Sequence, residues 1–280
     1  MPLETFLPIV YDIRESDRFR RSPVKYNVGI DIGSTCAKTV VLDENKNILH
    51  RLLQPTGWSS AETADAIHSQ LTELCVDWDQ AAVVATGYGR ICVPYADKCV
   101  TEITCHGRGA CHIFGSDNLT VIDIGGQDTK LICVEDRMVK DFIMNDKCSA
   151  GTGRFLEIMS NTLGVKPQQL CELAEQGGGV SISSMCTVFA ESEVISLIGR
   201  GESKENIAFG VVDSIVRKVA SQASRLDLHS CAVCLTGGLC DFDYLRRSLA
   251  KKLGTAVAVC PDARYAGAIG AALSAAAIRK

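Results

Sequence analysis

Apolar runs typical of buried strands alternate along this chain with stretches of helical periodicity. Residues 26–33 (YNVGIDIG) form an apolar run that ends on a carboxylate and a glycine, and 38–53 holds two apolar stretches around a polar turn at 44–47. These patterns predict three consecutive strands. Apolar residues three and four positions apart predict a helix over 61–75, and AAVVATGYG at 81–89 predicts a fourth strand that ends in a glycine-containing loop.

The same order of elements begins again in the middle of the chain. Residues 119–144 (LTVIDIGGQDTKLICVEDRMVKDFIM) repeat the layout of 28–50, with a strand, a carboxylate, a glycine turn and two further strands. The alignment pairs Asp31 with Asp123, Gly33 with Gly125 and Lys38 with Lys130. An internal repeat of this length predicts a duplicated α/β fold with two facing halves. The cleft between the halves is the expected ligand site.

The second copy continues with further helices. Ser203 is a typical N-cap residue in front of a long amphipathic pattern, which predicts a helix. CAVCLTGG at 231–238 predicts a strand that runs into a third glycine turn. We expect Asp241 to cap the next helix and Gly254 to end it. The small residues of 265–278 predict a closely packed final helix.

The composition narrows the class of protein. With 280 residues, 46% hydrophobic and 22% charged, the chain suits two domains or one duplicated domain. A net charge of −4 provides no broad basic field, so no nucleic-acid partner is expected. No apolar run long enough to span a membrane is seen, and no signal peptide, so we expect a cytoplasmic protein without membrane attachment. The 14 cysteines then remain free thiols.

Two similar motifs carry the candidate nucleotide chemistry, DIGSTCAK at 31–38 and DIGGQDTK at 123–130. Glycine turns let backbone N–H groups approach phosphate oxygens. The predicted phosphate-binding residues are Gly33, Ser34, Thr35, Lys38, Gly125, Gly126, Gly237 and Gly238. Asp31 and Asp123 are expected to converge on one Mg²⁺, mostly through its waters. The alternative is a set of ordinary hairpin turns without a ligand. The motif of a Walker A loop is absent.

The roles of several side chains near these turns have more than one interpretation. Gln127 and Asp128 are placed to orient an attacking water near a γ-phosphate, while Asp128 equally suits a turn-stabilising role. Lys38 either reaches a phosphate or lies outward on its strand. His106 follows a cysteine, but adjacent residues of a helix point apart, so we expect a hydrogen-bonded structural histidine.

Two cysteines stand out because each sits in a polar loop before an amphipathic helix, Cys148 and Cys186. A helix N-terminus presents free N–H groups and a partial positive charge, which favours the thiolate that binds metal. Two ligands per chain are too few for a four-thiolate site, which would need a second chain. The alternative is that both are small buried residues. We assign no role to the other twelve.

With these motifs the chain resembles the activator ATPases of 2-hydroxyacyl-CoA dehydratases, within the superfamily of actin, sugar kinases and heat-shock chaperone ATPases. The matching segments are VGIDIGST, TGYGR, TEITCHGRGA, VIDIGGQDTK, NDKCSAGTGRFLE, SMCTVFAESEVISL, TGG and YAGAIGAA. The resemblance implies a duplicated actin-like (ribonuclease H-like) fold that binds ATP or ADP with Mg²⁺. It further implies a homodimer that holds one [4Fe–4S] cluster with two cysteines from each chain, here Cys148 and Cys186.

The resemblance also implies a function. The expected protein is an ATPase that passes one low-potential electron, received from ferredoxin or flavodoxin, to an iron–sulfur acceptor such as a 2-hydroxyacyl-CoA dehydratase or a double-cubane protein. We expect 1–24 to form an N-terminal extension, 25–118 plus 266–280 the first half and 119–265 the second half with the cluster cysteines. The alternatives are a small-molecule kinase for a sugar or an acid, and an ATP-sensing assembly protein like actin.

Overall fold

The computed structural model describes residues 25–183, 186–226 and 231–278, and it contains two five-stranded mixed sheets. The first sheet has the order β3-β2-β1-β4-β5, with β1 (Tyr26–Ile32), β2 (Cys36–Leu42), β3 (Ile48–Pro55), β4 (Ala81–Thr86) and β5 (Lys98–Cys99). The second has the order β10-β9-β6-β7-β8, with β6 (Leu119–Ile124), β7 (Thr129–Glu135), β8 (Met138–Asn145), β9 (Ala232–Gly237) and β10 (Val257–Ala258). The two orders correspond strand by strand, as the internal repeat predicts.

The strand registers repeat as well. Asp31 lies opposite Lys38 in the β1–β2 pair, and Asp123 lies opposite Lys130 in the β6–β7 pair. On the other side, where the strands run parallel, Asp31 lies opposite Thr86 in β4 and Asp123 opposite Thr236 in β9. Each carboxylate therefore stands at the carboxyl end of the central strand of its sheet, with equivalent neighbours on both sides.

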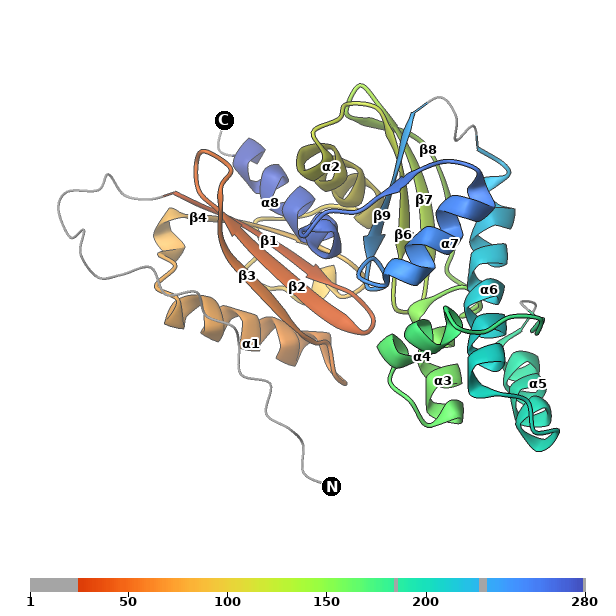
Figure 1. Ribbon diagram of the computed structural model, residues 1–280. Helices are drawn as coiled ribbons and strands as arrows, with labels where there is room; N and C mark the ends of the chain where they lie inside the picture. Colours follow the sequence, from red (N-terminus) through yellow and green to blue (C-terminus); the bar gives the residue numbers. More distant parts are fainter. Residues whose placement is uncertain (1–24, 184–185, 227–230, 279–280) are drawn as a thin grey trace, which may run out of the picture.

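Two helices lie side by side between the sheets, α2 (Glu102–Phe114) and α8 (Ala266–Ile278) (Figure 1). Helix α2 contacts β6, β7 and β8 of the second sheet, while α8 contacts β1, β2 and β4 of the first. Glycines allow the two backbones to touch. A Cβ on Gly109 would stand 1.9 Å from the carbonyl oxygen of Ala266, and one on Gly270 would stand 1.8 Å from that of Cys105. Any larger residue at either glycine would push the helices apart.

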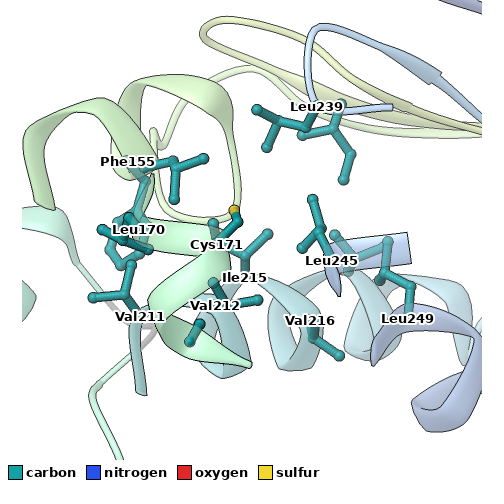
Figure 2. Packing of buried hydrophobic residues seen from close by; sticks show 14 of the residues in the cluster. Phe155, Leu170, Cys171, Val211, Val212, Ile215, Val216, Leu239, Leu245 and Leu249 are labelled. Carbon is teal, nitrogen blue, oxygen red and sulfur yellow. The ribbon is translucent and has the colours of Figure 1, made fainter. Parts of the chain in front are cut away.

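The remaining helices distinguish the two halves. The first half adds α1 (Ser60–Glu73), which buries an apolar stripe and is capped by the Ser59 side chain. The second half adds α3 (Gly153–Leu163), α4 (Pro167–Ala174), α5 (Thr187–Gly199), α6 (Lys204–Ala223) and α7 (Asp243–Leu253). Figure 2 shows how side chains from α3, α4, α6 and α7 meet in one core, among them Phe155, Leu170, Ile215, Leu245 and Leu249. Three short 3₁₀ helices are Trp78–Gln80, Arg90–Cys92 and Ala263–Tyr265.

Most predicted elements are present, and one predicted cap is wrong. Helix α7 begins after Phe242 rather than at Asp241, whose side chain instead pairs with Arg264. Gly254 ends that helix in a left-handed conformation, as predicted. The expected N-terminal extension, 1–24, lies outside the described residues. Within the part of the chain that is described, no helix has both the length and the apolar character needed to cross a membrane.

Candidate nucleotide and cluster site

The two strand-end aspartates converge at the meeting point of the sheets. Asp31 and Asp123 are almost fully buried, and the imidazole of His106 from α2 lies between them. Its Nε2 is 4.0 Å from Asp31 Oδ2 and its Nδ1 is 3.3 Å from Asp123 Oδ1. The ring therefore joins a carboxylate of the first sheet to a carboxylate of the second. The sequence predicts a structural role for His106 but does not predict this position between the two aspartates.

A buried lysine neutralises the second aspartate. Lys130 Nζ lies 2.7 Å from Asp128 Oδ2, 3.5 Å from Asp123 Oδ2 and 3.8 Å from Glu102 Oε2. Burial opposes the charge on Lys130, but these three carboxylates outweigh that effect and raise its pKa. Burial also raises the pKa of Glu102, although Lys130 acts against the increase. An ammonium group enclosed by three carboxylates is a fixed part of the site.

Asp123 is held in its charged form. Burial opposes its ionisation, but the electrostatic effects of His106 and Lys130 outweigh burial. The hydroxyl of Thr236 also donates to Asp123 Oδ1 at 2.8 Å. Together these contacts lower the pKa of Asp123 to about 2. A carboxylate that stays charged in a buried position is suited to a cation or to its hydration shell.

The glycine turns of the two halves meet each other. A Cβ on Gly126 would stand 2.1 Å from Thr35 Oγ1 and 3.5 Å from Ser34 Oγ, so the two turns abut. Gly237 has a φ of +86°, and a Cβ there would stand 2.4 Å from the carbonyl oxygen of Ile124. Only glycine allows this closeness without strain. The fold thus brings the predicted phosphate turns together, and the lack of side chains at Gly126 and Gly237 permits this close approach.

The other predicted side chains occupy distinct positions around these turns. Lys38 Nζ lies 3.9 Å from where a Cβ on Gly33 would be, so its amine reaches over the first turn. No ion pair holds it among the described residues. Gln127 is exposed at the tip of the second turn, while Asp128 beside it is half-buried and paired with Lys130. Gly238 has open space around its Cα, and its N–H donates to the Ile124 carbonyl at 3.0 Å.

The segments that carry the two candidate cluster cysteines, Cys148 and Cys186, are in contact. Both cysteines are half-buried, and the residues that follow them are joined, with Ser149 Oγ 2.7 Å from Thr187 Oγ1. Cys186 directly precedes α5, as the sequence predicts. Cys148 lies in the loop before α3, also as predicted, and that helix begins at Gly153. Nowhere in the described chain do three or more His, Cys, Asp or Glu side chains gather as metal ligands.

Hydrogen bonds tie the Cys148 loop to the second glycine turn. The N–H groups of Gly153 and Arg154, which open α3, donate to the carbonyls of Gly125 at 2.9 Å and of Gly126 at 2.7 Å. In addition, the buried Thr129 hydroxyl donates to the carbonyl of Gly151 at 2.8 Å. In the sequence a β-hairpin separates these two segments, but in the folded chain hydrogen bonds join them directly.

The sequence prediction assigns no part in the nucleotide site to four residues found here, namely His106, Glu102, Thr236 and Gly87. Gly87 has a φ of +88° and packs against Asp31 as Gly237 packs against Asp123, so it is the repeat equivalent of that glycine. The shared sequence T-G at the ends of β4 and β9 would have revealed this pair. No local signal marks His106 or Glu102, because the crossing of α2 between the sheets decides where they lie.

Comparisons with known proteins agree with this architecture. The model of the BadF/BadG/BcrA/BcrD ATPase family matches residues 28–275. The chain is 43% identical to the (R)-2-hydroxyglutaryl-CoA dehydratase activating ATPase of Acidaminococcus fermentans, over 89% of this chain and 96% of that protein. The structure of the activator of 2-hydroxyisocaproyl-CoA dehydratase from Clostridium difficile, with bound ADPNP, has a TM-score of 0.83 at 35% identity, covering 90% of this chain and 95% of that one.

A more distant likeness shows the fold alone. A ROK family glucokinase from Streptomyces griseus has a TM-score of 0.55 at 16% identity, covering 89% of this chain and 98% of that one. The predicted duplicated actin-like ATPase fold, with two mixed sheets and helices, is confirmed by these structural matches.

Proposed function

This chain belongs to the BadF/BadG/BcrA/BcrD ATPase family, and we propose that it is an ATP-driven electron donor that activates a 2-hydroxyacyl-CoA dehydratase or a related iron–sulfur acceptor. The observation that carries this proposal is the direct hydrogen bonding between the second phosphate turn and the loop of Cys148. A protein that uses ATP to change the state of a metal centre needs such a connection, whereas a kinase does not.

The polar groups around Asp31 and Asp123 suit a hydrated Mg²⁺ and the phosphates of ATP. Two buried polar atoms, Asp31 Oδ1 and His106 Nδ1, have no hydrogen-bond partner among the described residues, which is expected where a hydrated ion completes the site. Asp31 and Asp123 would hold Mg²⁺, mostly through water. When bound, the ion would neutralise charge on the β- and γ-phosphates. Lys38 would contact a phosphate, because its amine extends over the first turn without another partner in the described chain.

Gln127 is the better candidate for orienting the attacking water. Its side chain is exposed at the tip of the second turn, where it is free to face the cleft. Asp128 is occupied by its 2.7 Å ion pair with Lys130. We therefore assign to Asp128 the role of fixing Lys130 beside Asp123, and to Gln127 the role of positioning the water.

The cysteine pair fits half of a [4Fe–4S] site. Cys148 and Cys186 are both half-buried and neighbour each other through the Ser149–Thr187 contact. The amide groups at the start of α5 would stabilise a negatively charged group beside Cys186. A bound cluster would store one electron at low potential. Since one chain offers two thiolates, a homodimer related by a two-fold axis would complete the site.

The partners follow from the same chemistry. Ferredoxin or flavodoxin would supply the electron, and the acceptor would be the dehydratase or a double-cubane protein. The kinase alternative is not favoured, because relatives that are 43%, 41% and 37% identical are dehydratase activators. We propose that 25–118 plus 266–280 and 119–265 are the two halves that move around the nucleotide, sliding where α2 meets β6, β7 and β8.

Anaerobic purification tests this function. Holo protein is expected to be brown, to hold about four iron and four sulfide per dimer, and to hydrolyse ATP. Dithionite-reduced protein with ATP should pass an electron to a purified dehydratase of this class, and ADP should not support the transfer. Sedimentation should give a dimer that weakens when the iron is chelated. Protein that stays colourless after iron and sulfide reconstitution, yet phosphorylates a sugar or an acid, would refute the proposal in favour of a kinase.

A further inference from the structure

His106 occupies a place that neither the phosphate turns nor the cluster loop explains. It comes from α2 and its side chain is 6% exposed, in the space where the two sheets meet. Its two ring nitrogens face carboxylate oxygens of opposite halves, Asp31 at 4.0 Å and Asp123 at 3.3 Å. The ring therefore stands between the two carboxylates.

The surrounding backbone is shaped around this ring. A Cβ added to Gly267 of α8 would stand 2.8 Å from His106 Nε2 and 2.6 Å from Asp31 Oδ2. The absence of a side chain at Gly267 therefore leaves room for the imidazole and the carboxylate together. His106 Nδ1 and Asp31 Oδ1 remain without hydrogen-bond partners among the described residues, although both are buried.

We propose that His106 is a positioning residue that sets the spacing of Asp31 and Asp123 and thereby the geometry of Mg²⁺ at the phosphates. This inference rests on the proposed Mg²⁺-dependent ATP hydrolysis. Without the ring, the two carboxylates repel each other across the gap and the halves lose a rigid spacer. Misplacement of a catalytic group by about 1 Å lowers turnover by about a hundredfold.

Three substitutions separate the two contacts of the ring. His106→Ala removes both nitrogens. His106→Asn keeps an amide near the position of Nδ1, beside Asp123, whereas His106→Gln extends an amide toward the position of Nε2, beside Asp31. Because the Asp123 contact is the shorter, Asn should restore more function than Gln. Gly267→Ala tests the same spacing from α8, since the new methyl group displaces either the ring or the Asp31 carboxylate.

Two measurements report on this role. Turnover with saturating ATP should fall by about tenfold to a hundredfold in His106→Ala, while the KM for ATP changes much less, because spacing of the ion acts mainly in the transition state. The second measurement is binding of ADP to cluster-free protein, with and without Mg²⁺, by calorimetry. The gain in ADP affinity that Mg²⁺ provides should shrink in His106→Ala. His112→Ala, on the exposed side of the same helix, is the matched control and should match the wild type.

The outcomes are distinct. If the wild type itself shows no Mg²⁺-dependent ATP hydrolysis, the proposed function fails. If the wild type is active and His106→Ala keeps both its turnover and its Mg²⁺-dependent gain in ADP affinity, the positioning role is overturned. Equal losses in the Ala, Asn and Gln variants would reduce His106 to a packing residue and also overturn it. Should His106→Ala fail to fold, His106→Asn and Gly267→Ala give the same decision.

Discussion

Replacing Thr129 by valine should weaken the link between the nucleotide and the cluster loop while preserving the shape of the side chain. Thr129 begins β7, directly after the second phosphate turn, and is almost fully buried. Its hydroxyl donates to the carbonyl of Gly151 at 2.8 Å, within the loop that carries Cys148. Valine fills the same volume but cannot donate, so the carbonyl loses this donor.

The size of the effect follows from the buried carbonyl. Loss of a partner for a buried acceptor costs about 1–3 kcal/mol, which corresponds to a change of about 5- to 150-fold in the equilibrium between a docked and an open loop. The two backbone hydrogen bonds that Gly153 and Arg154 donate to the turn remain, so the loop is loosened rather than released. Global stability should fall by no more than the same amount.

Chelation of iron from the holo protein measures the coupling. In the wild type the chelation rate should differ between ADP and a non-hydrolysable ATP analogue, because a nucleotide shifts an equilibrium only through its differential affinity for the two states. In Thr129→Val the rate should rise and the ratio between the two nucleotides should move toward one. Hydrogen exchange over 146–152 in cluster-free protein should speed up in parallel.

A matched control removes an equally buried hydroxyl elsewhere in the same half. Ser160 donates to the Leu156 carbonyl within α3 at 2.7 Å and has no bond to the phosphate turn. Ser160→Ala should keep the wild-type ratio of chelation rates. A ratio in Thr129→Val that equals the wild-type ratio, with unchanged exchange over 146–152, would refute the assignment of this hydrogen bond to the coupling path.

Three further outcomes are expected. Cys148→Ser or Cys186→Ser should remove most of the iron but spare ADP binding. Substitution of the exposed Cys75 by serine is the control and should keep the full iron content. Full iron in either cluster variant would contradict the ligand assignment. Gln127→Ala should slow ATP turnover and leave ATP affinity unchanged, and an unaltered turnover rate would exclude it as the water-positioning group. Because Asp123 has a pKa lowered to about 2 from 3.8, its stabilising effect is present above about pH 4 and is lost as the pH falls toward 2. Acid denaturation monitored by circular dichroism should show this loss in the wild type, and Asp123→Asn should lack it.

The sequence predicts the repeating parts of this protein well, because its hydrophobic periods and its turns are local signals. The strand pattern around Asp31 and Asp123 recurs with the same spacing, and the structure gives both the same register against their lysines. The end of α7 at Gly254 is also a local signal, because the left-handed backbone conformation that follows a helix favours glycine. The cap at Asp241 is predicted wrongly because its carboxylate pairs with Arg264, which lies far along the chain.

The positions of the residues between the halves cannot be predicted from local sequence patterns. His106 and Glu102 are placed by the contact of α2 with α8 and the second sheet, and that contact depends on glycines whose neighbours are distant in sequence. Lys130 shows a further limit. The repeat makes it equivalent to Lys38, yet Lys130 is enclosed by carboxylates while Lys38 has no ion pair in the described chain. Equivalent positions of a duplicated fold thus serve different purposes once the halves diverge.

This divergence suggests which half transmits the signal. The second half contains the buried Lys130–Asp123 pair, the turn that opens α3 and the loop of Cys148, all connected by hydrogen bonds or ion pairs. The first half meets this assembly through Thr35 against Gly126 and through His106 beside Asp123. A nucleotide that draws the first half onto the second turn would therefore press on the carbonyls to which α3 is bonded. On this reasoning the first half senses closure, and the second half converts closure into a movement of the cysteine loop.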